Sequence, residues 1–187
     1  MLRHFLLLTF MLLNFSRAEA WMFDFNLFYF SKTLTIDSAE TGSQMFGDLA
    51  FSLELSKKNA VYLGWSYGFR STSDASTTTT TISASEMGPK FGMFFDKDMT
   101  WGAFVTYNLV ATSTYAPGGG TEQTWRGSTI KAEIGWAPQI TDNMFIGIRL
   151  NYYTAPFTER IQNVTDYAQV SIPRTLMYPA FFFAYRL

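Results

Sequence analysis

The residues best suited to chemistry in this chain are its acids and bases, which recur at alternate positions within short apolar segments. Side chains at alternate positions of a β-strand point to the same face. This spacing therefore predicts one face on which carboxylates and cations lie together, where burial would oblige them to pair. The candidate members of this charge network are Asp24, Lys32, Asp48, Glu54, Arg70, Glu86, Lys90, Lys131, Glu133, Arg149 and Arg186.

Proton-transfer catalysis near neutral pH most often uses histidine, and the 187-residue chain has one, His4. That residue lies in a segment that we expect to be cleaved, which would leave the serine and threonine hydroxyls without an activating base. The chain has no cysteine, which excludes a disulfide, a thiolate zinc site and a cysteine nucleophile. The sequence therefore predicts a protein that is not an enzyme, with no catalytic residues, metal site or cofactor.

Residues 1–20 have the three zones of a secretory signal peptide: a short basic start, the apolar run 5–13 and a polar end with Ala18 and Ala20. A helix as short as this run spans ~14 Å, under half of the hydrocarbon core of a bilayer, which disfavours a membrane anchor. We expect cleavage after Ala20. The chain then divides into a signal peptide, residues 1–20, and a mature domain, residues 21–187.

The mature domain alternates apolar and other residues with a period of two, which is strand geometry. The eight expected strands cover approximately residues 22–32, 46–56, 60–71, 84–95, 100–112, 126–137, 144–154 and 175–187. The apolar pattern rests on 38 positions in the eight strands, and none of these 38 residues is charged. Nearly all of the strand charges lie in the other phase, so the expected sheet has one apolar face and one face that carries the charges.

The connections between the expected strands alternate in length. Short links follow the second, fourth and sixth strands, and the longer loops cover residues 33–45, 72–83, 113–125 and 155–174. This alternation is typical of an up-and-down meander in a membrane. Residues 71–85 are mostly serine and threonine, which favours a flexible polar loop there over a hairpin extended by the β-branched threonines 77–81. Pro89 and Pro179 fall inside expected strands, and we expect them at bulges or strand ends.

The apolar face decides the class of protein. A soluble, lipocalin-like barrel would have its apolar face inside and its charges outside. Here aromatic residues gather near the strand ends of the uncharged face, as they do at membrane interfaces. The expected interface aromatics are Tyr29, Tyr67, Phe95, Trp101, Tyr107, Trp136, Tyr152 and Tyr185. Because lipid cannot satisfy an open backbone edge, the sequence predicts an all-β fold, an eight-stranded antiparallel up-and-down transmembrane β-barrel.

The signal peptide, the eight amphipathic segments and the terminal pattern Phe181-x-Phe183-x-Tyr185-x-Leu187 resemble the small eight-stranded outer membrane β-barrels of Gram-negative bacteria. The OmpA-domain and OmpX type is the nearer resemblance, and OmpW the more distant. The family usually ends in an aromatic residue, from which Leu187 departs. The resemblance implies an outer membrane location with both termini periplasmic, contact with outer membrane lipid and lipopolysaccharide, and assembly by periplasmic chaperones and the barrel-assembly machinery.

The interior of an eight-stranded barrel is just wide enough for side chains. Antiparallel pairing suggests that Glu133 faces Arg149, Arg70 faces Glu86 and Lys32 faces Asp48, with Asp24 near Arg186 at closure. A lumen plugged by salt bridges is the favoured interpretation, and a gated pore whose charges switch partners is the alternative.

The expected function is therefore structural or surface-interactive, with envelope integrity or loop-mediated adhesion to an extracellular partner as its forms. The alternative is a narrow, porin-like channel for small or hydrophobic solutes. The formal net charge of -1 gives no basic surface for nucleic acid.

Overall fold

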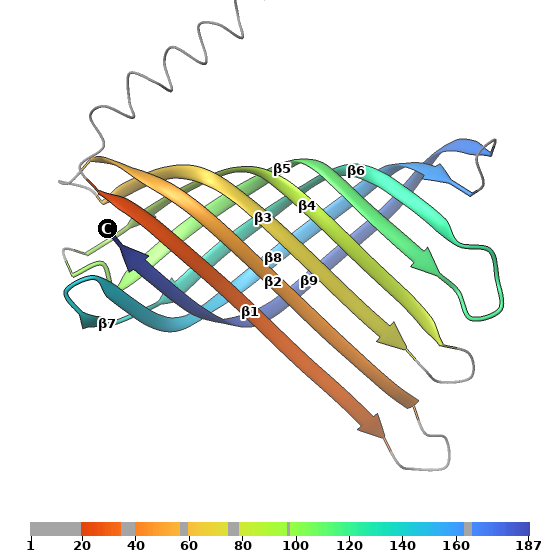
Figure 1. Cartoon of the computed structure of the whole chain (residues 1–187), viewed down its shortest axis with the longest axis horizontal. Helices are drawn as coiled ribbons and strands as arrows, with labels where there is room; N and C mark the ends of the chain where they lie inside the picture. Colours follow the sequence, from red (N-terminus) through yellow and green to blue (C-terminus); the bar gives the residue numbers. More distant parts are fainter. Residues whose placement is uncertain (1–19, 35–39, 57–59, 75–78, 97, 163–165) are drawn as a thin grey trace, which may run out of the picture.

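The period-two segments form strands, and the strands pair into one antiparallel sheet that closes into a ring. The computed structural model describes residues 20–34, 40–56, 60–74, 79–96, 98–162 and 166–187. Its strands are β1 (Trp21–Leu34), β2 (Glu40–Ser56), β3 (Val61–Asp74), β4 (Thr80–Phe94), β5 (Trp101–Ala116), β6 (Gln123–Trp136), β7 (Gln139–Thr141), β8 (Met144–Ile161) and β9 (Tyr167–Arg186). Consecutive strands β1 to β6 are neighbours, and the β6–β8, β8–β9 and β9–β1 pairings close the ring (Figure 1). This confirms the predicted all-β, antiparallel, up-and-down arrangement.

β7 is a short addition that the sequence did not predict. It consists of three residues within the expected link 138–143, and it pairs with the start of β8. Residues 1–19 of the expected signal peptide lie outside the described residues. Within the described ranges, no helix is long and apolar enough to span a membrane.

The strands extend further into the expected long loops than the apolar pattern indicates. β3 and β4 stay paired through Ser73↔Thr81 and Asp74↔Thr80, so the prediction of a flexible loop over residues 71–85 is wrong for its described part. β8 and β9 likewise stay paired to Ile161↔Tyr167. Serine and threonine satisfy a backbone ladder as well as apolar residues do, and threonine is β-branched, so loss of hydrophobicity did not mark the strand ends.

Both prolines lie where the ladder does not need their missing N–H. Pro89 falls at the irregularity where the β4–β5 register shifts, between the pairs Met87↔Val110 and Lys90↔Thr106, as predicted. Pro179 lies inside β9, directly beyond the last β1–β9 pair, Leu27↔Phe181. Each proline therefore occupies a position at which one neighbour strand has moved away.

The seam between β1 and β9 is the shortest pairing in the ring. β1 makes fourteen residue pairs with β2, from Trp21↔Leu53 to Leu34↔Glu40. It makes six with β9, from Met22↔Arg186 to Leu27↔Phe181, with reciprocal backbone hydrogen bonds between Trp21 and Leu187 at the end. Beyond Leu27 and Phe181 the two strands diverge (Figure 1), so their facing edges have no ladder partner there.

Amide hydrogen exchange should detect this open half of the seam. We expect about half of the amides in residues 28–34 and 168–180 to exchange early, because in an antiparallel strand every second N–H points to the same neighbour. Strands β3 and β4, which are paired on both sides, serve as the internal control and should stay protected. Equal protection of all four strands would contradict an open seam.

Asp96 organises the turn between β4 and β5. Its carboxylate accepts hydrogen bonds from the backbone N–H of Thr100 at 3.0 Å and of Trp101 at 2.9 Å. Partial desolvation raises the pKa of Asp96, but these two N–H donors outweigh it and hold the pKa below its usual range. Met99, in the same turn, adopts a positive φ of 52° and directs its side chain back into the ring.

Replacing this carboxylate should give a pH-dependent loss of stability. We expect Asp96→Ala to lower the free energy of unfolding by about 1 kcal/mol, the usual worth of such hydrogen bonds. Since the folded pKa is depressed, the difference from the wild type should be complete above the unfolded-state pKa of ~4 and shrink as the pH falls through the folded pKa. Urea unfolding at several pH values measures it. Asp98→Ala, at the exposed neighbouring carboxylate, is the control and should show neither effect.

Candidate functional site: the interior charge network

Four ionised side chains from four strands form a closed circuit across the interior. Lys90 donates a hydrogen bond to Asp24 Oδ1 at 2.6 Å, although the two are 66 residues apart in sequence. Arg149 donates to Glu133 Oε2 at 2.6 Å. Lys90 Nζ lies 3.6 Å from Glu133, and Arg149 Nη1 lies 3.7 Å from Asp24. We refer to Asp24, Lys90, Glu133 and Arg149 as the charge quartet, in which each charge has two partners of opposite sign.

A chain of four further charges continues from the quartet. Lys131 Nζ lies 2.6 Å from Glu133 Oε1 and 2.7 Å from Asp48 Oδ2. Asp48 Oδ1 is in turn 3.4 Å from Arg70 Nη2. Arg70 forms a two-nitrogen contact with Glu86 through Nε and Nη2. The network therefore runs unbroken from Asp24 on β1 to Glu86 on β4.

Neutral side chains add hydrogen bonds to this network. Glu86 Oε2 accepts from the Thr129 hydroxyl at 2.6 Å and from the Tyr153 hydroxyl at 3.0 Å. Arg70 donates to the Tyr178 hydroxyl at 2.6 Å. Asn108 on β5 donates to Thr129. With Asn108 and Tyr178 included, every strand of the ring except the short β7 contributes a polar group to the network.

Aromatic rings enclose the two arginines. The Arg149 guanidinium carbon lies 3.4 Å from the centroid of the Phe182 ring and 3.8 Å from that of Phe104. The Arg70 guanidinium carbon lies 4.0 Å from the Tyr153 ring. Such cation–π contacts gain strength where water is excluded. These rings hold each guanidinium in place while its nitrogens bind carboxylates.

The network is electrically balanced and buried. Asp24, Asp48, Glu86 and Glu133 carry four negative charges, and Arg70, Lys90, Lys131 and Arg149 carry four positive charges. Each of these residues has 3% or less of its surface exposed. Burial on this scale is tolerable because each charge has a partner at short range.

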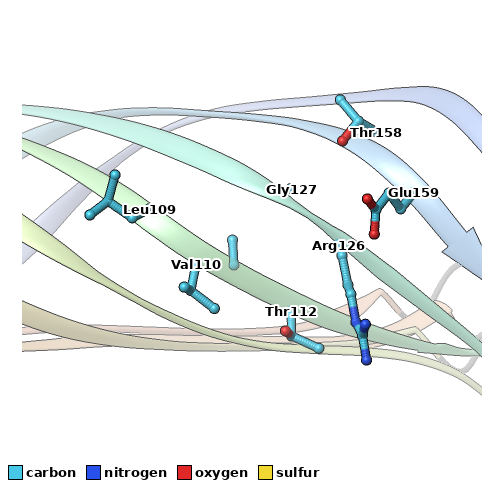
Figure 2. Close-up of a pocket in the computed structure, with 8 residues that line it drawn as sticks. Leu109, Val110, Thr112, Arg126, Gly127, Thr158 and Glu159 are labelled. Carbon is cyan, nitrogen blue, oxygen red and sulfur yellow. The ribbon is translucent and has the colours of Figure 1, made fainter. Parts of the chain in front are cut away.

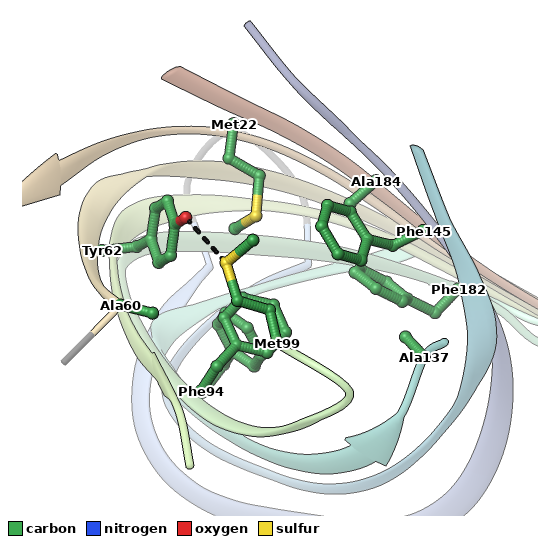
Figure 3. Close-up of a cluster of buried hydrophobic side chains, with 10 residues drawn as sticks. Met22, Ala60, Tyr62, Phe94, Met99, Ala137, Phe145, Phe182 and Ala184 are labelled. Carbon is green, nitrogen blue, oxygen red and sulfur yellow. Dashed lines mark hydrogen bonds between the residues drawn. The ribbon is translucent and has the colours of Figure 1, made fainter. Parts of the chain in front are cut away.

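Apolar layers cover the network on both sides along the ring axis. On β1 the order is Met22, then Asp24, then Phe28, and these apolar residues belong to different buried clusters. The cluster on the side of the chain termini is Met22, Ala60, Tyr62, Phe94, Met99, Phe104, Ala137, Phe145, Phe182 and Ala184 (Figure 3). The cluster on the hairpin side is Phe46, Ala111, Tyr153, Ala155, Phe157, Tyr178 and Ala180, with Phe28, Trp125, Ile172 and Leu176 packed against it. The interior side chains therefore form three layers along the axis: apolar, charged and apolar.

The structure brings two expected charge pairs together, but not by the expected register. Gly135, not Glu133, is directly opposite Arg149. A Cβ at Gly135 would lie 2.5 Å from Arg149 Cγ, so the missing side chain lets Arg149 cross over Gly135 to reach Glu133. Likewise Gly68 is opposite Glu86, which leaves room for Glu86 to meet Arg70 diagonally. Both predicted registers were wrong by two residues, because the prediction placed the two charges of each pair directly opposite each other.

Two other expected pairs are wrong. The register places Asp48 opposite Asn26, and Lys32 opposite Gly42, six positions further along β1. The side chain of Lys32 lies outside the described residues. Arg186 pairs with Glu54 at 2.6 Å near the end of the ring, where its side chain is 28% exposed, and Asp24 pairs inside the ring with Lys90.

Several interior polar residues were not predicted as members of the site. Tyr153, Tyr178, Thr129 and Asn108 all bind the network or its ligands. They share the interior phase of their strands with the charged residues. Their alternate positions along the strands would have identified them, but only residues with a formal charge were chosen as candidates.

The outer surface of the ring has the opposite character. All of the expected interface aromatics are exposed there: Tyr29, Tyr67, Phe95, Trp101, Tyr107, Trp136, Tyr152 and Tyr185. Between them lie further exposed apolar side chains, among which Met177 is 68% and Ile148 59% exposed. The ring therefore has a charged interior and an apolar outer belt.

In the described part of the chain, no three His, Cys, Asp or Glu residues form a group that could hold a metal ion. The carboxylates of the network are all occupied by ammonium, guanidinium or hydroxyl groups. The arrangement thus cross-links the strands that contribute these side chains.

Comparison with known proteins identifies the fold. No protein-family profile matches the chain, and no curated protein sequence matches it. Among solved structures, the crystal structure of Neisserial surface protein A (NspA) matches with a TM-score of 0.51 at 8% sequence identity. The match covers 89% of this chain and 96% of that one. At this identity the likeness shows a shared fold, an antiparallel up-and-down ring of strands.

Removing one charge from the centre of the network should lower the free energy of unfolding far more than removing one charge at its edge. We expect Lys131→Met to lower the free energy of unfolding by about 3 to 5 kcal/mol, because Asp48 and Glu133 each lose a buried partner. The double variant Lys131→Met with Asp48→Asn should lose less than Lys131→Met alone. Arg186→Gln is the control and should cost less than Lys131→Met, because Arg186 is 28% exposed and its loss leaves one carboxylate, Glu54, without its partner instead of two. Urea unfolding of the refolded protein measures all of these, and equal losses for Lys131→Met and Arg186→Gln would contradict the role of the network.

Proposed function

We propose that this chain is an integral outer membrane β-barrel protein with its lumen closed by the charge network. The observation that carries the proposal is the inverted distribution of polarity, with charges inside the closed ring and an apolar belt outside. A charge on a lipid-facing position costs ~2 to 4 kcal/mol at the bilayer midplane, which accounts for the uncharged belt. A closed sheet also suits a bilayer because lipid offers no hydrogen bonds to a strand edge.

The proposed role is structural or surface-interactive. The apolar, charged and apolar layers of interior side chains support a closed lumen, and a closed lumen favours envelope integrity or loop-mediated adhesion over transport. The fold shared with Neisserial surface protein A, a surface protein by name, supports a location at the cell surface. We further propose that both termini face the periplasm and that the long hairpins face outward.

The proposed partners follow from this location. Outer membrane lipid and lipopolysaccharide would contact the apolar belt, and the outward hairpins would meet an extracellular partner. Periplasmic chaperones and the barrel-assembly machinery would act during biogenesis. We propose no enzyme activity, because the network carboxylates are engaged in ion pairs and a neutral imidazole base is not part of the mature domain.

A narrow channel is the second candidate. The observation that favours it is a set of buried interior polar atoms without a protein hydrogen-bond partner, including both amide atoms of Asn26 and the Thr106 hydroxyl. Water would satisfy such groups. A chain of water molecules past the network would make the lumen conductive.

Planar-bilayer recording distinguishes a sealed lumen from a channel. Insertion is established first, by the heat-modifiable gel mobility of the refolded protein. We expect the inserted wild type to be electrically silent, because the charge quartet fills the lumen. Glu133→Ser with Arg149→Ser removes a neutral pair and two long side chains from the quartet, and should produce discrete conductance.

Glu54→Ser with Arg186→Ser is the matched control. It removes an acid–arginine pair of the same 2.6 Å length from the end of the ring, leaves both apolar layers and the quartet intact, and should stay silent. Discrete conductance of the wild type would instead establish the channel. A protein that stays soluble and monomeric without detergent would overturn both candidates.

A further inference from the structure

Two short links at the end of the ring that carries the chain termini turn a side chain back into the lumen. Met99, between β4 and β5, has a φ of 52°, and Ala60, between β2 and β3, has a φ of 43°. Left-handed backbone is unfavourable for residues other than glycine and persists where the surrounding structure imposes it. Both side chains are buried in the apolar cluster at this end of the lumen (Figure 3). Strained backbone at both links is thus coupled to an inward side chain.

Met99 supplies the larger of these two side chains, and its thioether meets the Tyr62 hydroxyl. The hydroxyl donates a hydrogen bond to Met99 Sδ at 3.4 Å. Tyr62 has 1% of its surface exposed, and a thioether sulfur is a weak acceptor. The Glu54 carboxylate, which is opposite Tyr62 in the β2–β3 register, binds Arg186 instead. Among the described residues, this buried hydroxyl therefore depends on the sulfur of Met99 for its acceptor.

A few hydrogen bonds within its own link hold Met99 in place. Its N–H donates to the Asp96 carbonyl oxygen at 3.2 Å, and the Asp96 carboxylate binds the N–H groups of Thr100 and Trp101. Met22 belongs to the same cluster but lies on β1, where it is paired with both β2 and β9. Local opening of the link is enough to expose Met99, whereas Met22 is exposed only when strands separate.

The other methionines of the described strands face outward, in the phase of the apolar belt. They are Met45, Met87, Met93, Met144 and Met177. In the proposed membrane orientation their sulfur atoms lie against lipid, while the links at the termini end lie at the aqueous boundary of the periplasm. Among the described methionines, Met99 is therefore the one that a water-borne oxidant reaches most readily.

We propose that Met99 is an oxidation site, at which a water-borne peroxide converts the thioether to a sulfoxide and expels the side chain from the lumen. This inference rests on the proposed membrane location. The sulfur lone pair attacks one peroxide oxygen, so that an S–O bond forms as the O–O bond breaks. With hydrogen peroxide the second oxygen leaves as water. The sulfur gives up two electrons, and these reduce the peroxide.

The sulfoxide no longer fits the position that the thioether occupies. The added oxygen is polar, and it enlarges a side chain in a cluster that contains the rings of Phe94, Phe104 and Phe145. Tyr62 offers one hydrogen bond to this oxygen, but a solvated position offers water and also relieves the left-handed φ of Met99. Oxidation therefore favours a conformation in which Met99 faces the periplasm and water reaches the end of the lumen.

Oxidation kinetics test the site. The refolded full chain in detergent micelles is treated with hydrogen peroxide, and peptide mass spectrometry follows each methionine separately. We expect Met99 to be oxidised at least about tenfold faster than Met22, because its link opens without separating strands. Asp96→Ala should accelerate the oxidation of Met99 about fivefold, the worth of one ordinary hydrogen bond, and leave Met22 unchanged. Asp98→Ala, at the exposed neighbouring carboxylate, is the matched control and should change neither rate.

A cysteine probe tests the opening of the lumen without an oxidant. The chain has no cysteine, so Ala184→Cys places a single thiol in the same cluster, at a position that is 0% exposed. A charged maleimide then labels Met99→Gln, a polar replacement that peroxide does not oxidise, and Met99→Leu, which stays apolar. We expect Met99→Gln to be labelled about tenfold faster, because its polar side chain favours the solvated position. Ala137→Cys, in the same cluster, is a second probe and should give the same order.

Two results would overturn the proposal. One is equal oxidation of Met99 and Met22, and the other is equal labelling of the Met99→Gln and Met99→Leu variants. Rapid labelling of Ala184→Cys beside the native Met99 would also overturn it, because this end of the lumen would already be open. Heat-modifiable mobility is recorded for every sample. Its absence in the wild type would count against the membrane location, whereas a folded barrel with equal rates counts against the oxidation site alone.

Discussion

The burial of eight formal charges with no net charge is the constraint on which the rest of this structure depends. Removing one member would leave its partners buried and unpaired, at a cost of about 3 to 5 kcal/mol. Six strands must therefore place their charged residues at the same height along the ring axis. Where a long side chain crosses a neighbouring strand, that strand must have a glycine. Gly135 beneath Arg149 and Gly68 beside Glu86 meet that requirement. Tyr153 and Thr129 donate further hydrogen bonds to Glu86, and Tyr178 accepts one from Arg70.

The apolar layers explain why such a network can persist. Water that reached the charge quartet would compete for each ion pair, and the rings of Phe104 and Phe182 cover Arg149 by direct contact. The outer belt is the counterpart of this interior. Polarity that a soluble domain would place on its surface is enclosed here, and apolar side chains that it would bury are exposed. A bilayer is the solvent in which both halves of this arrangement are favourable.

The regular ring is interrupted in two places, and both have consequences. The β1–β9 ladder ends at Leu27↔Phe181, which leaves facing strand edges unpaired and gives Pro179 a position that needs no N–H. The bulges at Leu109–Val110 on β5 and Thr158 on β8 hollow the wall of the ring on either side of β6 (Figure 2). Irregular backbone of this kind re-aims side chains, so functional sites on a barrel wall are expected where the ladder shifts.

The sequence by itself determined which side chains share a face. A period of two is local, so Asp24, Lys90 and Glu133 could be assigned to one face, and the exposed aromatics to the other, without knowledge of the fold. It did not mark the strand ends over residues 71–85, because serine and threonine carry a ladder without an apolar signal. Only the tertiary structure decided the partners: Asp24 binds Lys90 on β4, not Arg186 on the adjacent β9, and Arg149 reaches Glu133 diagonally across Gly135. The register and closure of the ring decide which interior residues lie at the same level. Register and closure depend on the bulges and on the offset of each strand against the next, added around the whole ring. No local pattern in the sequence encodes this total offset.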